Sequence, residues 1–128
     1  MNKIVKSSIF IIKLSDKFEL LKLKIELLLN IGKIDEEISK QASEYYQFFE
    51  NLGTINLLIK NPEVRSKTVI ALEADSHRIE QLKTNSKKIG ITLGNGYGIW
   101  KENTIRIANF PAIEQSEIDQ LKCFFSEI

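Results

Sequence analysis

The segment from residue 89 to 112 constrains the fold more than any other part of the chain. A short apolar run at 91–93 leads into glycines at 94, 96 and 98, and an alternating run follows from Thr104 to Phe110. Alternation with a period of two is typical of a β-strand, and glycines between two such runs are typical of a tight connection. Alternate residues of the second run would lie on opposite faces of the sheet. One face would carry Ile105, Ile107 and Asn109, and the other would carry Arg106, Ala108 and Phe110.

Apolar side chains spaced three and four residues apart predict four helices, at 16–31, 35–52, 76–89 and 115–127. Gly32 is read as the stop of the first helix, and Asp75 or Ser76 as the cap of the third. A β-rich run at 68–74 predicts one further strand. The aromatic residues at 45, 46, 48 and 49 are read as core positions and not as a platform for stacking bases.

This order of elements predicts an α+β fold: a small, largely antiparallel, three-stranded sheet covered by helices on one face. A length of 128 residues fits one domain with a real core. We interpret residues 1–14 as a divergent N-terminal arm and residues 15–128 as the domain itself.

Charge and cysteine content exclude several classes of function. The chain has 18 basic and 17 acidic residues and a formal charge of +1, spread evenly along its length. We therefore expect no nucleic-acid partner and no membrane partner. The single cysteine, Cys123, fits a reducing cytoplasm, and we expect it to be a buried or half-buried helix residue without a catalytic role.

Arg106 is the candidate binding residue that the strand pattern singles out. A guanidinium on a rigid strand beside small residues can hold a carboxylate or a phosphate, although a solvated charge that protects a strand edge is the alternative. The segment 94–98 fits no nucleotide-binding fingerprint, because a strand follows it, and its spacing alone indicates a tight connection that needs positive φ. His77 is expected at the surface, and no spacing of His, Cys, Asp or Glu indicates a metal site.

Residues 90–112, with Arg-Ser-Lys-Thr-Val at 65–69 upstream, resemble a known family. The Gly-x-Gly-Tyr-Gly loop, the Ile-Arg-Ile-Ala-Asn-Phe-Pro-Ala strand and the closing helix are similar to the C-terminal small domain of class V pyridoxal phosphate-dependent aminotransferases. The phosphoserine aminotransferase branch is the nearest match, over roughly residues 18–128. The resemblance implies transamination of phosphoserine with 2-oxoglutarate in serine biosynthesis. It also implies that Arg106 binds the substrate α-carboxylate and that Gly96, Tyr97 and Gly98 lie near the mouth of the same cleft.

The resemblance covers only a part of such an enzyme. In the family, the Schiff-base lysine and the groups around the cofactor belong to the large domain. We therefore expect no cofactor and no catalysis in this chain alone, and we expect a large-domain partner chain or self-association through the helix at 16–31. Two alternatives remain open, a non-enzymatic amino-acid-binding or regulatory module and a protein-interaction module.

Overall fold

The computed structural model describes residues 14–128. The predicted arm at 1–14 lies outside the described residues except for Leu14, where the first helix begins. The chain divides into two compact parts, Met1–Asp35 and Glu36–Ile128. Each part is described here by itself.

Helix α2 runs from Leu14 to Leu52, so the predicted stop at Gly32 is wrong. Gly32 does not have a positive φ, and open space surrounds the position that a Cβ would take. A glycine inside a helix costs only about 1 kcal/mol relative to alanine, and the many Leu, Lys and Glu residues around it favour the helix. The helix propensity of the residues around Gly32 therefore keeps α2 continuous at this position.

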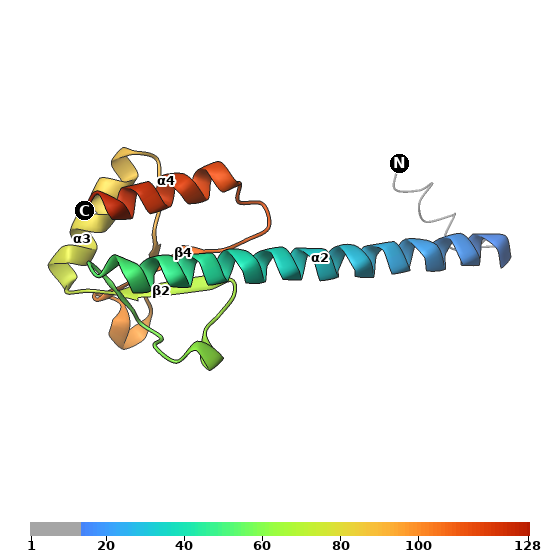
Figure 1. Ribbon diagram of the computed structural model, residues 1–128, viewed down its shortest axis with the longest axis horizontal. Helices are drawn as coiled ribbons and strands as arrows, with labels where there is room; N and C mark the ends of the chain where they lie inside the picture. Colours follow the sequence, from blue (N-terminus) through green and yellow to red (C-terminus); the bar gives the residue numbers. More distant parts are fainter. Residues whose placement is uncertain (1–13) are drawn as a thin grey trace. The chain divides into compact units, whose positions relative to one another are not determined.

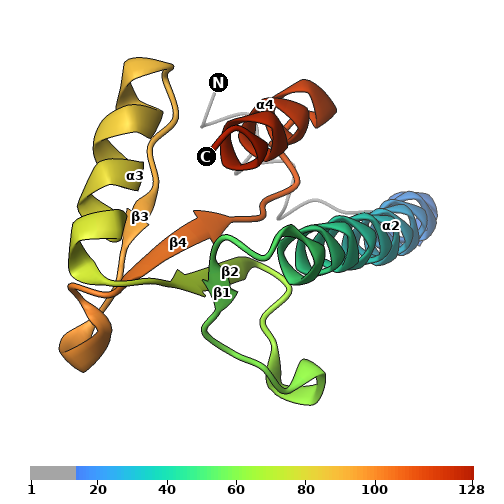
Figure 2. The same cartoon turned by 60° about the vertical axis from the view of Figure 1, so that its left-hand side comes forward.

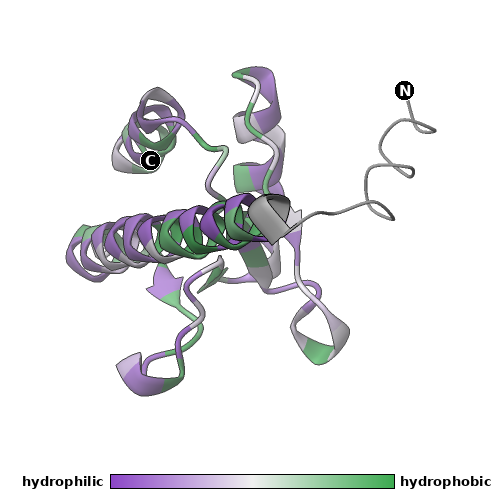
Figure 3. Ribbon diagram, turned by 90° about the vertical axis from the view of Figure 1, so that its right-hand side faces the viewer, coloured by the Kyte–Doolittle hydropathy of each residue, from purple (hydrophilic) through white to green (hydrophobic). Residues whose placement is uncertain are grey.

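The part of α2 before residue 36 exposes its apolar side chains. Ten large apolar residues there have exposed fractions between 39% and 70%: Phe18, Leu20, Leu21, Leu23, Ile25, Leu27, Leu28, Leu29, Ile31 and Ile34. Figure 3 shows hydrophobic and hydrophilic residues mixed along the helix. This segment therefore exposes apolar surface, and its association with a partner stays a prediction.

The second part contains a four-stranded antiparallel sheet in the order β1-β2-β4-β3. Two five-residue strands, β2 (Val69–Glu73) and β4 (Thr104–Ala108), lie side by side at its centre (Figure 2). β1 (Asn56–Leu57) and β3 (Gly94–Asn95) flank them. The prediction of an antiparallel sheet in an α+β fold is confirmed, but the two-residue strand β1 was missed. The strand expected at 91–93 is wrong in position, because β3 pairs with β4 only through residues 94 and 95.

Helices α3 (Ser76–Lys88) and α4 (Gln115–Ser126) and the end of α2 share one core with the inner sheet face (Figure 1). Sixteen residues from 42 to 125 are buried and apolar there, including Ile70, Leu72, Ile105 and Ile107 of the central strands. Phe49 meets Phe125 edge to face with ring centroids 5.0 Å apart, which confirms the core interpretation of the aromatic residues of α2. On the opposite face of β4, Arg106 is half-buried and Ala108 is exposed, as the alternation predicted, whereas Thr104 at the start of the strand is buried.

Three local predictions have clear outcomes. Asp75 caps α3 by accepting a hydrogen bond from the backbone N–H of Arg78 at 2.9 Å, as expected. Ile89, predicted as the last residue of the helix at 76–89, lies just beyond α3 as its C-cap and is 47% exposed, beside Gly90, whose φ is +83°. Cys123 is exposed and not buried, since α4 turns the neighbouring Phe124 and Phe125 toward the core instead.

Candidate functional site

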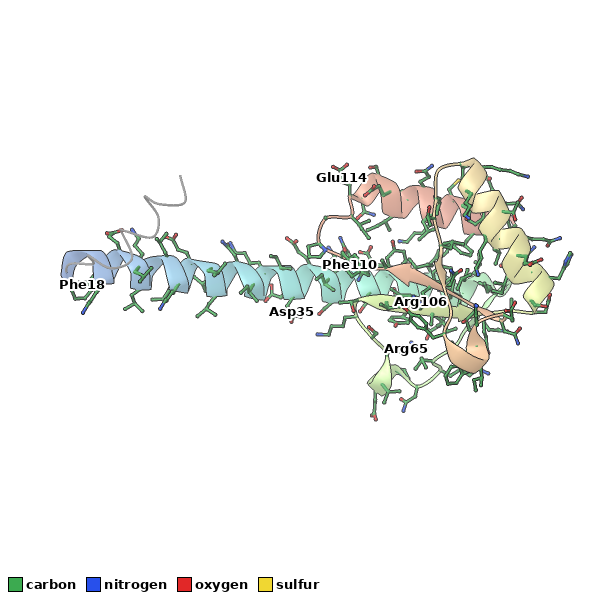
Figure 4. The ribbon with its side chains drawn as sticks, turned by 180° about the vertical axis from the view of Figure 1, so that it is seen from behind. Phe18, Asp35, Arg65, Arg106, Phe110 and Glu114 are labelled. Carbon is green, nitrogen blue, oxygen red and sulfur yellow. The ribbon has the colours of Figure 1, made fainter. Side chains whose placement is uncertain are left out.

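Arg106 lies on the outer face of β4, opposite the isoleucines, where the alternation placed it (Figure 4). Its Nε donates a hydrogen bond of 2.6 Å to the carbonyl oxygen of Asn95 on the neighbouring strand. Its guanidinium carbon lies 4.1 Å from the centre of the Tyr97 ring. The half-buried side chain is therefore held at Nε and along one face of its guanidinium plane.

The outer end of this guanidinium is open. Among residues 14–128, no hydrogen bond or ion pair occupies the Nη1 and Nη2 groups of Arg106. These two amino groups form the planar fork that binds a carboxylate through two parallel hydrogen bonds. The arrangement leaves the carboxylate-binding edge of the guanidinium free while the rest of the side chain is fixed, and it is suited to a planar oxyanion.

Gly96 gives the loop beside Arg106 its close packing. A Cβ at this buried position would overlap the Oγ1 of Thr104 and lie 2.6 Å from the carbonyl oxygen of Trp100. The same Thr104 hydroxyl donates a hydrogen bond of 2.6 Å to that carbonyl oxygen. Only a residue without a side chain allows this approach, so the glycine is needed for contact and not for a positive φ.

Gly98 is the one glycine of the 94–98 segment with a positive φ, at +56°. It begins a 3₁₀ turn, Gly98–Trp100, in which the N–H of Trp100 bonds the carbonyl oxygen of Tyr97 at 3.1 Å. The prediction of a tight connection that needs positive φ is therefore confirmed at one of three glycines. The turn leaves Tyr97 70% exposed, with its ring against the Arg106 guanidinium.

The structure brings Arg106 and Tyr97 into contact and places Gly96 and Gly98 in the loop that carries Tyr97. Sequence reasoning missed Asn95 and Thr104, whose contributions are a backbone acceptor and a loop-closing hydroxyl. Every residue type has a backbone carbonyl oxygen, so the identity of residue 95 does not predict this contact. Its only signal is the register of β3 against β4, which pairs residue 95 with Ile105.

The motif at 65–69 has structural contacts. Arg65 forms an ion pair of 2.7 Å with Glu50 and donates hydrogen bonds to the carbonyl oxygens of Ile59 and Lys60 at 3.0 and 3.2 Å. The Oγ of Ser66 accepts hydrogen bonds from the N–H groups of the residues at 68 and 69, both at 3.2 Å. The guanidinium of Arg65 is thus occupied within the fold, in contrast to that of Arg106 (Figure 4).

Other kinds of site find little support in the part of the chain that the structure describes. No group of three or more His, Cys, Asp and Glu side chains is placed to hold a metal ion among residues 14–128. His77 is exposed, as expected, and its ring nitrogen pairs with the Gln81 amide at 3.1 Å. No helix within the described range combines the length and apolar character that a membrane span requires.

No family model and no curated protein matches the sequence, but solved structures do. A phosphoserine aminotransferase from Cytophaga hutchinsonii is 25% identical with a TM-score of 0.62, over 73% of this chain and 26% of that chain. An alanine–glyoxylate aminotransferase from Nostoc sp. is 16% identical with a TM-score of 0.61, over 72% of this chain and 25% of that one. The enzyme C-DES, solved with glycine covalently linked to its pyridoxal phosphate cofactor, is 15% identical with a TM-score of 0.57, over 76% of this chain and 24% of that one. The second and third likenesses show a shared fold alone.

The predicted resemblance to the aminotransferases is confirmed by these structures. The chain spans about a quarter of the length of the structures it matches. A pyridoxal phosphate site needs a lysine amine made reactive by burial or by a neighbouring cation, together with groups that hold the phosphate and the ring. The buried polar residues in the described range are Ser86, Thr104 and Asn109, so no buried lysine is present there. These residues do not form a site for the cofactor by themselves.

Proposed function

We propose that the chain is the substrate-carboxylate-binding C-terminal domain, or a fragment, of a phosphoserine-type aminotransferase. In this proposal it acts with a large domain on another chain or segment, which supplies the lysine and the rest of the cofactor site. The chain alone would then be inactive in transamination.

One observation carries the proposal: the Arg106 guanidinium is fixed by Asn95 and Tyr97, while its two amino groups have no partner among residues 14–128. A strand arginine that only protected an edge would not need a backbone acceptor and a stacked ring to orient it. The 25% identity to a phosphoserine aminotransferase supports this substrate class among the aminotransferases.

The chemistry gives such an arginine a clear task. Transamination breaks the Cα–H bond of an amino acid, and that bond must be held in one direction for the proton to leave. Two parallel hydrogen bonds from Nη1 and Nη2 to the α-carboxylate would fix one end of the substrate without reacting with it. The Tyr97 ring already restricts the guanidinium before the substrate arrives. The side chain therefore loses less conformational entropy when the substrate binds.

The first experiment uses the chain as it is. We expect titration with glutamate or O-phosphoserine to shift the NMR signals of Gly96, Tyr97 and the Arg106 Nε–H. A primary amine of similar size without a carboxylate should leave the same signals unchanged. Equal shifts with the amine would contradict carboxylate recognition at this site.

The second experiment measures turnover after the chain is combined with a matching large domain. Arg106→Lys keeps the charge but loses the planar fork, and Arg106→Ala loses both. We expect kcat/KM for phosphoserine to fall at least roughly tenfold in both, which is about 1.4 kcal/mol of transition-state stabilisation. Folding should stay within about 0.5–1 kcal/mol of the unchanged chain. Lys101→Ala, which removes a neighbouring exposed cation, is the matched control. Unchanged kinetics in both Arg106 variants would exclude the arginine from the site.

A second candidate function is a protein-interaction or amino-acid-binding module that does not take part in catalysis. The ten exposed apolar side chains of α2 before residue 36 favour it, since soluble monomers rarely expose apolar surface of this extent. Recovery of transamination with a large domain would decide for the first proposal. Binding of glutamate by the chain, with no turnover in any reassembly, would decide for the second.

A further inference from the structure

A cavity of about 240 Å³ lies in the second part of the chain, apart from Arg106 and its loop. It opens where residues 90–93 diverge from β4, because β3 pairs with that strand only from residue 94 onward. α4 closes the other side through Glu117, Gln120 and Leu121. Its apolar wall consists of Ile91, Leu93, Ile107, Ile113 and Leu121.

The Tyr45 side chain is buried, and it lines the wall of this cavity. Tyr45 is 1% exposed and lines the cavity, yet no hydrogen bond to its hydroxyl exists among the described residues. A buried tyrosine hydroxyl usually finds a partner. The Tyr45 hydroxyl is not one of the fully buried unpaired atoms, so a molecule inside the cavity can reach it and form a hydrogen bond with it.

Among the described residues, Glu117 supplies the only charge in the cavity wall. Its Oε2 accepts a hydrogen bond of 2.7 Å from the backbone N–H of Glu114, and no cation within residues 14–128 pairs with its carboxylate. Burial and, second, the charge of Glu117 raise the pKa of Tyr45 to about 12, so the hydroxyl stays neutral beside the carboxylate. At the rim, the Gln120 amide nitrogen donates a hydrogen bond of 3.2 Å to the carbonyl oxygen of Ile89, which leaves its amide oxygen as a third acceptor.

We infer that this cavity binds a small primary amine with an apolar tail. An ammonium group has three N–H donors and no acceptor, and the wall offers three acceptors: the free Glu117 oxygen, the Tyr45 hydroxyl and the Gln120 amide oxygen. The aliphatic wall takes the tail. A carboxylic acid is excluded, because it would bring a second negative charge against Glu117.

The volume sets the size of the ligand. An engineered apolar cavity of about 150 Å³ holds benzene, and drug-sized ligands need about 300–1,000 Å³. A cavity of about 240 Å³ therefore suits a ring or short chain that carries one amino group. Benzylamine has this size and charge and is the probe for the experiment.

The test titrates the full chain with benzylamine, benzyl alcohol and benzoate and follows the methyl signals of Ile107 and Leu121 by NMR. We expect saturable shifts with benzylamine in the millimolar range, at least tenfold weaker binding of benzyl alcohol and none of benzoate. Benzyl alcohol or benzoate binding as well as benzylamine would overturn the inference, as would unchanged signals with all three. This comparison needs no variant. It is also independent of the proposed function, because Arg106 recognises the opposite charge.

Variants of Glu117 and Tyr45 then test whether these side chains accept hydrogen bonds from the amine. Glu117→Gln keeps an oxygen for the Glu114 N–H, as glutamine does at this helix position, but it removes the charge. We expect its affinity for benzylamine to fall at least tenfold, to the level of benzyl alcohol, and Tyr45→Phe to weaken binding severalfold. Asp119→Asn, on the same helix but outside the cavity wall, is the matched control and should bind unchanged. An unchanged affinity in Glu117→Gln would refute the role of the carboxylate.

Discussion

Replacement of Gly96 by alanine tests whether the loop beside Arg106 depends on backbone contact. The new methyl group would overlap Thr104 Oγ1, lie 2.6 Å from the Trp100 carbonyl oxygen and lie 3.2 Å from Thr104 Cβ. Real Cβ atoms essentially never come within 3.0 Å of such atoms, and the carbonyl belongs to the backbone and cannot rotate away. The loop must therefore move as a whole.

The expected loss of stability has two parts. Overpacking by one methyl group costs about 1–3 kcal/mol. Rotation of the Thr104 side chain would break its hydrogen bond to Trp100, which costs about 0.5–1.5 kcal/mol more. We therefore expect Gly96→Ala to lower the free energy of unfolding by about 2–4 kcal/mol, from a total of about 5–15 kcal/mol for a domain.

Urea unfolding, followed by far-ultraviolet circular dichroism and by the fluorescence of Trp100, the single tryptophan, measures this loss. Gly94→Ala is the graded control, because its nearest contact is the Arg106 carbonyl oxygen at 3.1 Å and a small shift relieves it. Gly32→Ala adds a methyl group in open space inside α2 and should stabilise the helix by up to about 1 kcal/mol. In a Thr104→Ala background the Oγ1 obstacle is gone, so the cost of Gly96→Ala should fall by about 1 kcal/mol. A Gly96→Ala variant within about 0.5 kcal/mol of the unchanged chain would refute the contact argument.

Two further predictions concern α2. The exposed apolar side chains before residue 36 should drive self-association at high concentration, which sedimentation equilibrium measures. Leu21→Glu with Leu28→Glu should abolish it while Glu26→Gln does not, and a strictly monomeric unchanged chain would contradict the idea. The second prediction rests on the pKa of Tyr45, raised to about 12 by burial and Glu117. Between pH 10 and 12 the folded chain keeps this proton and the unfolded chain loses it, so the stabilisation present below pH 10 is lost as pH rises through that range. Solvent at the open cavity screens the effect, and we expect a loss of about 1–2 kcal/mol relative to Tyr45→Phe in urea unfolding at each pH. Parallel pH curves for the two proteins would rule out this titration.

The sequence alone determined the helices and strands in which buried residues recur at a regular spacing. The alternation of β4 set the isoleucines inside and Arg106 outside, and the structure agrees residue by residue. The cap of α3 and the inward residues of α4 were also predictable, since each depends on side chains within one or two turns. The amphipathic pattern reports which face is buried because burial acts on every turn or pleat alike.

Gly32 marks the limit of this local reasoning. A glycine after a leucine-rich run is a helix stop when the chain adopts a positive φ there, and an ordinary helical residue when it does not. The residue type is compatible with both outcomes, and the surrounding helix decides. Gly53 and Gly90 took the positive φ, at +73° and +83°, and Gly32 did not.

Only the tertiary structure decided where the candidate sites lie. The contact of Arg106 with Asn95 and Tyr97 depends on the register of β3, a strand of two residues whose pairing leaves no periodic signal. The cavity depends on residues 90–93 turning away from β4 and on Tyr45 and Glu117 meeting across 72 positions of sequence. Such contacts form only when whole helices and strands pack together. The residue pattern within one element does not show which other element will lie beside it.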